Sequence, residues 1–132
     1  MLRLKYMIRK LFYIFLLSLG LNFVWENLHS FLYASYQGGP IGEFILLRAA
    51  LGDAVLLGIL ALPFFYLDFF KKRKWLIIPI GVAVAILIEL YALHTGRWAY
   101  NSYMPLIPFL DVGLTPTLQL GLLGWVVYFL MI

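Results

Sequence analysis

The stretch LFYIFLLSLGLNFVWENLHSFLYASY, residues 11–36, is mostly apolar but carries polar residues at helical spacing. A helix needs about 20 mainly apolar residues to cross the hydrocarbon core of a membrane, because backbone groups left without partners there are costly. Residues three or four apart lie on one helix face, so the polar residues form a stripe. We therefore predict a transmembrane helix whose polar stripe faces other helices. Its members are Ser18, Asn22, Glu26, His29, Tyr33 and Tyr36.

Three further apolar stretches have the same character, at residues 44–67, 75–93 and 113–132. The whole chain of 132 residues is 64% hydrophobic and only 12% charged, whereas soluble domains are roughly half apolar and a quarter charged. Cysteine is absent, which excludes disulfides and thiol chemistry. We predict an all-α, four-transmembrane-helix bundle that forms a single integral membrane domain over residues 1–132.

Basic residues indicate how this bundle is oriented. Four of them lie in residues 3–10, before the first span, and the run KKRK at residues 71–74 follows the second. Two crossings bring both clusters to one side, which the positive-inside rule makes cytoplasmic. We therefore expect both termini in the cytoplasm and a multi-pass protein of the bacterial inner membrane. The net charge of +4 is explained by membrane lipids rather than by nucleic acid.

A cleavable signal peptide is the competing interpretation of the N-terminus. A basic region precedes the apolar residues 11–21, and the small residues Ser18 and Gly20 within that stretch could mark a cleavage site. Against this, the helical pattern continues without a break to residue 36, and removal of the first helix would leave an odd number of spans.

One polar side chain from each predicted helix falls at a similar depth, about 5–15 Å below the outer end. An acid at the centre of a membrane helix costs about 2.5–3.5 kcal/mol, so three acids at one depth favour a functional site. The fourth helix also has a seam of small residues, and Gln119 points away from it, which makes Gln119 the weakest member. The layer comprises Glu26, Asp53, Glu89 and Gln119, and the nearby groups that could offset its charge are His29, Arg48, His94 and Arg97.

The spacing of the layer suggests chemical roles. Glu26 and His29 are three residues apart and could exchange protons near neutral pH. Asp53 and Glu89 would set their charge or stabilise a cationic intermediate. These four are the candidate catalytic residues. We predict no cofactor and no metal, because Glu-x-x-His metal sites in bundles need a second such pair. The candidate substrate-binding residues are Asn22, Trp25, Tyr33, Arg48, Arg97, Trp98, Tyr100 and Gln119.

The segment between the third and fourth spans, residues 94–112, is too rich in glycine and proline for a spanning helix and too aromatic for a solvated loop. Trp98, Tyr100 and Tyr103 are typical of residues at the membrane interface. Arg97 follows Glu89 by eight positions, so we expect it to fold back and pair with a carboxylate or to bind an anionic headgroup.

The order of short motifs resembles a family of small, uncharacterised bacterial four-helix membrane proteins. The motifs are NFVWE at 22–26, Tyr33, GD at 52–53, Glu89, GRWAY at 96–100, MP at 104–105 and GLTPTLQ at 113–119. The resemblance implies that these positions belong together, and it brings no activity with it. A fainter similarity, to carotenoid-biosynthesis membrane enzymes, is one of architecture only.

These observations lead to three hypotheses. The first is an intramembrane site that binds or converts a lipid-like or isoprenoid molecule, entered laterally from the outer leaflet. The second is a proton- or cation-coupled transporter, which would act as a homo-oligomer because four helices enclose little volume. The third is a structural or assembly subunit in which the polar layer only joins helices.

Overall fold

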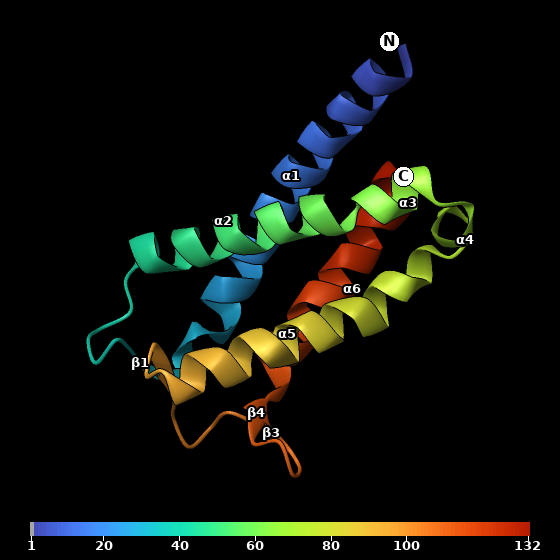
Figure 1. Cartoon of the computed structure of the whole chain (residues 1–132). Coiled ribbons are helices and arrows are strands. Elements are labelled where there is room, and N and C mark those ends of the chain that lie inside the picture. The colour runs from blue at the N-terminus through green and yellow to red at the C-terminus, as the bar shows by residue number, and fades with distance from the viewer. Residues whose placement is uncertain (1) are drawn as a thin grey trace.

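The computed structural model describes residues 2–132, and four of its helices are long and apolar enough to cross a membrane. This confirms the predicted number of long apolar helices. The four candidate membrane spans are Leu2–Leu32, Glu43–Tyr66, Lys74–His94 and Leu114–Met131. Figure 1 shows both termini toward one end of the bundle and the short strands at the other.

The first helix, α1 (Leu2–His29), differs from its predicted bounds of residues 11–36 at both ends. It begins earlier because lysine, arginine and leucine favour helix, so the basic segment is helical. It ends earlier because the chain turns through η1 (Ser30–Leu32) into β1 (Tyr33–Tyr36). The prediction that Tyr33 and Tyr36 extend the helical stripe is therefore wrong.

Strand β1 forms because it has a partner that is distant in sequence. It pairs antiparallel with β2 (Trp98–Tyr100), in the segment that precedes the last helix. A second small sheet joins β3 (Leu106–Ile107) to β4 (Val112–Gly113). The segment 94–112 therefore contributes to both sheets, which lie at the end of the bundle opposite the termini (Figure 1).

Proline and glycine set the bounds of the remaining helices. The second predicted span divides at Ala61, and Pro63 stands in the first turn of the shorter following helix, where a missing N–H is tolerated. The third long helix ends at His94, two residues before Gly96, whose φ of +72° suits glycine. These elements are α2 (Glu43–Leu60), α3 (Leu62–Tyr66), α4 (Asp68–Lys71), η2 (Lys74–Leu76), α5 (Ile77–His94) and α6 (Leu114–Met131).

The helices pack as two pairs. Helix α2 packs along α1, α5 packs along α6, and the contact of α1 with α6 joins the pairs, whereas α2 and α5 make little contact with each other. The α5–α6 crossing depends on glycine, because a Cβ at Gly81 would lie 2.5 Å from the Cα of Gly121. Such small residues let membrane helices approach closely.

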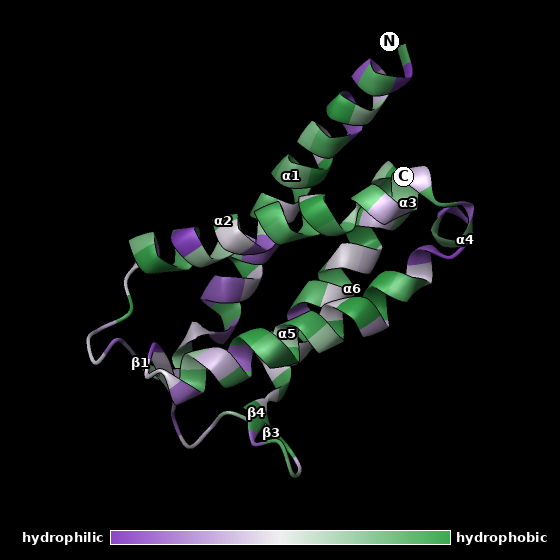
Figure 2. Cartoon of the chain, viewed as in Figure 1, coloured by the Kyte–Doolittle hydropathy of each residue, from purple (hydrophilic) through white to green (hydrophobic). Residues whose placement is uncertain are grey.

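The apolar core lies in the half of the bundle nearer the termini. It contains Ile14, Leu57, Phe64, Ile77 and Val127, all at most 1% exposed. Figure 2 shows hydrophobic residues along most of each long helix, with hydrophilic residues in the loop around α4 and at the ends of the bundle. The predicted polar residues lie in the other half, beside the strands.

Candidate functional site

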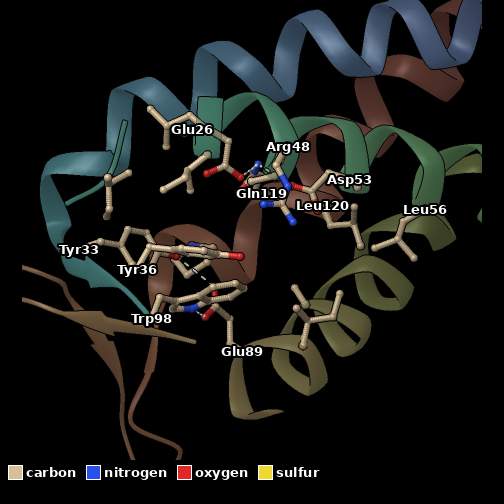
Figure 3. Close-up of a pocket in the computed structure, with 18 residues that line it drawn as sticks. Glu26, Tyr33, Tyr36, Arg48, Asp53, Leu56, Glu89, Trp98, Gln119 and Leu120 are labelled. Atoms are coloured by element: carbon tan, nitrogen blue, oxygen red, sulfur yellow. Dashed lines mark hydrogen bonds between the residues drawn. The ribbon is translucent and has the colours of Figure 1, made fainter. Parts of the chain in front are cut away.

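A cavity of about 430 Å³ lies between α2 and α5 and has both polar and apolar walls. Because these two helices pack on different partners, the cavity opens sideways between them, where Arg48, Ala49 and Gly52 of α2 are exposed. Figure 3 shows its polar side chains facing inward from both sides. The apolar walls include Ile45, Leu46, Leu56, Ala85, Ile88 and Leu120.

Gln119 of α6 is the centre of the polar wall and is 4% exposed. Its Nε2 lies 2.9 Å from Asn22 Oδ1, 3.0 Å from Glu26 Oε1 and 3.0 Å from Asp53 Oδ2. A primary amide carries only two N–H donors. The three acceptors from α1 and α2 therefore compete for two hydrogens, and one of them lacks a donor from Gln119 at any moment.

The two acids of this cluster are close together. Because Glu26 Oε1 and Asp53 Oδ2 each lie 3.0 Å from one nitrogen, they are no more than about 6 Å apart. Two like charges at that separation repel strongly where water is scarce. A proton or an incoming hydrogen-bond donor relieves both the repulsion and the shortage of donors.

His29 connects this cluster to the first turn of α6. Its Nε2 lies 3.1 Å from Glu26 Oε2, and its Nδ1 lies 2.9 Å from the Thr115 hydroxyl. The imidazole is 6% exposed and the Glu26 side chain 12%. In the tautomer that carries its proton on Nε2, His29 donates to Glu26 and accepts from the Thr115 hydroxyl through Nδ1.

Glu89 forms a second cluster across the cavity. The residue is 4% exposed and accepts three hydrogen bonds from aromatic side chains. Tyr33 Oη donates to Oε1 at 3.1 Å, while Trp98 Nε1 and Tyr100 Oη donate to Oε2 at 2.6 and 2.9 Å. Because Tyr33 lies in β1 and the other two lie in β2, one carboxyl group ties α5 to both strands.

The tyrosines of this cluster are kept in their donating form. Burial raises the pKa of Tyr33 well above its ordinary value, and the neighbouring Glu89 carboxylate raises it further. The pKa of Tyr100 is raised for the same two reasons. Both hydroxyls therefore keep their protons at physiological pH.

The predicted layer is assembled as a pocket, but not all predicted members reach it. Glu26, Tyr33, Arg48, Asp53, Glu89, Trp98 and Gln119 line the cavity. Asn22 and Tyr100 contact it through Gln119 and Glu89. Trp25 packs edge-on against His29.

Three predicted cations do not neutralise the acids. Arg97 is exposed and lies over the Tyr91 ring, and His94 is exposed and hydrogen-bonds the Leu90 carbonyl. Arg48 stands at the mouth of the cavity (Figure 3). Within residues 2–132, His29 is the only basic group paired with one of the three buried acids.

The sequence makes Gln119 the weakest member of the layer, because it points away from the small-residue seam. In the structure Gln119 nevertheless lies at the centre of the polar wall. Helix α6 contacts α5 on one side and α1 on another, so Gln119 and the seam residue Gly121 are both buried. Sequence reasoning missed Thr115, the partner of His29. Its only signal was its position in the GLTPTLQ motif.

Residues 2–132 contain no group of three or more His, Asp or Glu side chains that could hold one metal ion. Comparison of the chain with protein-family models, curated proteins and solved structures finds no match. The geometry of the cavity is thus the basis for assigning a function.

Proposed function

We propose that the cavity binds a lipid-like molecule of the isoprenoid type, which enters from the outer leaflet between α2 and α5. The observation that carries this proposal is the Gln119 amide, shared by three acceptors in the wall of a laterally open cavity. A buried acceptor without a donor costs about 1–3 kcal/mol. A ligand head that donates a hydrogen bond would remove that cost.

The shape and polarity of the cavity fit an amphiphile. Its volume of about 430 Å³ lies in the usual range for small-molecule sites. The acids lie deep in the cavity, and apolar side chains such as Ile45 and Ile88 flank the sides. An alcohol or amine head would lie beside Asp53, and an apolar chain would extend toward the gap between the helices.

The acids would then act on the ligand through proton transfer. Glu26 would give its proton to the bound molecule, keep the electron pair of the O–H bond as a carboxylate, and recover a proton through His29. Asp53 and Glu89 would stabilise positive charge that develops on the ligand. Binding without conversion uses the same contacts.

Farnesol and its methyl ether provide a direct test, because they share one chain and differ in the donating O–H. We would measure the binding of radiolabelled farnesol to the protein in nanodiscs, with either compound as competitor. We expect the ether to compete about tenfold or more weakly, since it cannot donate to the acids. Equal competition by the two compounds would contradict the proposal.

Two variants show where the probe binds. Ala49→Trp places a large side chain at the exposed mouth of the cavity and should abolish binding. Asp53→Asn supplies an internal N–H donor, so it should reduce the discrimination between alcohol and ether. The control is Asp68→Asn, which changes an exposed acid at the other end of the bundle. It should leave both the binding of farnesol and the discrimination between alcohol and ether unchanged. Unaltered binding by Ala49→Trp would rule out this cavity.

A structural role is the second candidate, and the Glu89 cluster favours it. One buried carboxyl group joins α5, β1 and β2 through three hydrogen bonds, which is a plausible use of an acid without a ligand. The two candidates differ in their prediction for Asp53→Asn. A purely structural layer predicts lower stability, whereas a binding site predicts a stable protein with altered selectivity.

A further inference from the structure

A second cavity, of about 600 Å³, lies at the end of the bundle toward which both termini lie. It is lined by the first turns of α1, by α3, by the loop around α4 and by Ile132. We propose that it binds the headgroup of an anionic phospholipid. This inference is independent of the function proposed for the cavity between α2 and α5.

The charge of the cavity carries the inference. Arg3, Lys71 and Lys74 line it, and no acidic side chain does. The only ion pair involving these three within residues 2–132 is Lys71 with Asp68, at 3.7 Å. Asp68 is 91% exposed, so solvent screens that pair. Three cations from two distant parts of the chain therefore line one hollow with little compensation from acidic side chains.

The remaining lining is suited to an acyl chain rather than to a free anion. Leu4, Met7, Phe64 and Phe65 contribute apolar surface to the same cavity. The helices on either side are candidate membrane spans, and the basic residues indicate that this end faces the cytoplasmic leaflet. Basic pockets between helices on that side fit anionic lipid headgroups. We therefore place a lipid phosphate among the three cations and an acyl chain along Leu4 and Met7.

Two other basic residues of the same loop, Lys72 and Arg73, allow this site to be distinguished from general surface charge. Arg73 lies over the Phe69 ring at 4.3 Å and donates to the Phe69 carbonyl, and Lys72 is exposed. Neither residue lines the cavity. The substitutions Lys71→Gln with Lys74→Gln and Lys72→Gln with Arg73→Gln thus remove the same charge from the same loop, but only the first pair alters the cavity.

The test is native mass spectrometry of the purified protein, incubated with equal amounts of dioleoylphosphatidylglycerol and dioleoylphosphatidylcholine. The unmodified protein should retain the anionic lipid preferentially. Each lysine near a lipid surface is worth about fivefold in affinity, so K71Q/K74Q should lower the preference about 25-fold. K72Q/R73Q should retain it. Equal losses in both double variants, or no preference in the unmodified protein, would overturn the proposal.

A second comparison probes the site from the other element. Arg3→Gln should weaken retention of the anionic lipid about fivefold, whereas Lys5→Gln, on the same helix but outside the cavity, should not. This pair remains informative if the loop variant does not fold. Equal retention by Arg3→Gln and Lys5→Gln would exclude the part of the proposal that joins α1 to the loop.

Discussion

Gln119 is a neutral residue among acids, and its amide contacts polar groups of both α1 and α2 in the cavity wall. An amide can donate to carboxylates without adding charge, which suits a site where charge is costly. Its two N–H groups are shared among three acceptors, one amide oxygen and two carboxyl oxygens.

Tyr100 provides a residue-scale prediction. Its hydroxyl donates to Glu89 and accepts a hydrogen bond from the Gly113 N–H at 3.0 Å. Tyr100→Phe leaves both partners incomplete and should lower the free energy of unfolding by about 2–4 kcal/mol. Thermal unfolding in detergent, followed by circular dichroism, measures the loss.

The matched control is Tyr103→Phe, because Tyr103 is 79% exposed. Removing its hydroxyl should change the free energy of unfolding by no more than about 0.5 kcal/mol. If the two variants unfold at the same temperature, the hydrogen bonds around Glu89 do not contribute to stability.

At the scale of elements, the α5–α6 crossing leaves no room for a side chain larger than glycine. A Cβ added at Gly121 would lie 2.6 Å from the Ile78 carbonyl oxygen and 3.2 Å from its Cα. These atoms are backbone and cannot rotate away. The crossing therefore sets the position of α6, and with it the positions of Gln119 and Thr115 relative to α1.

We predict that Gly121→Ala destabilises the protein by about 1–3 kcal/mol, because the two helices must separate. Gly58→Ala is the control, since it also lies within a helix but a Cβ there meets nothing within 4 Å. That change should be neutral or stabilising by up to about 1 kcal/mol. Comparable unfolding curves for the two variants would show that the close crossing is not required.

For the whole molecule, the polar and apolar parts are segregated along the bundle. The cavity with its acids lies toward the strands, whereas the core toward the termini is built from residues such as Ile14, Leu57 and Val127. This core offers a proton or cation no continuous series of polar groups. This segregation supports the proposed binding pocket over a transport path.

The orientation of the bundle gives a whole-molecule prediction that exploits the absence of cysteine. A single cysteine at Ser102, beside the strands, should react with a membrane-impermeant maleimide in intact cells. One at Lys72 should react only after the membrane is permeabilised, because the basic loop is expected on the cytoplasmic side. Both positions are exposed, so access alone does not separate them. The reverse labelling pattern would invert the topology.

The sequence by itself determined the four long apolar helices and the grouping of Glu26, Asp53, Glu89 and Gln119. Length and hydrophobicity suffice for the helices, because the membrane requirement acts on each segment alone. Depth along alternating spans suffices for the grouping, because helices rise by a constant distance per residue. The expected roles of these residues remain proposals.

Only the tertiary structure decided where α1 ends and which donors the acids receive. Tyr33 leaves the helical stripe because β1 pairs with β2, and it then donates to Glu89 from a strand. Thr115 reaches His29 because α6 packs against α1. These contacts join residues that are distant in the chain, and their direction depends on how elements cross. Periodicity within a segment carries no information about such crossings. For this reason the sequence made Gln119 the weakest member of the layer, although in the structure it contacts three of the polar side chains.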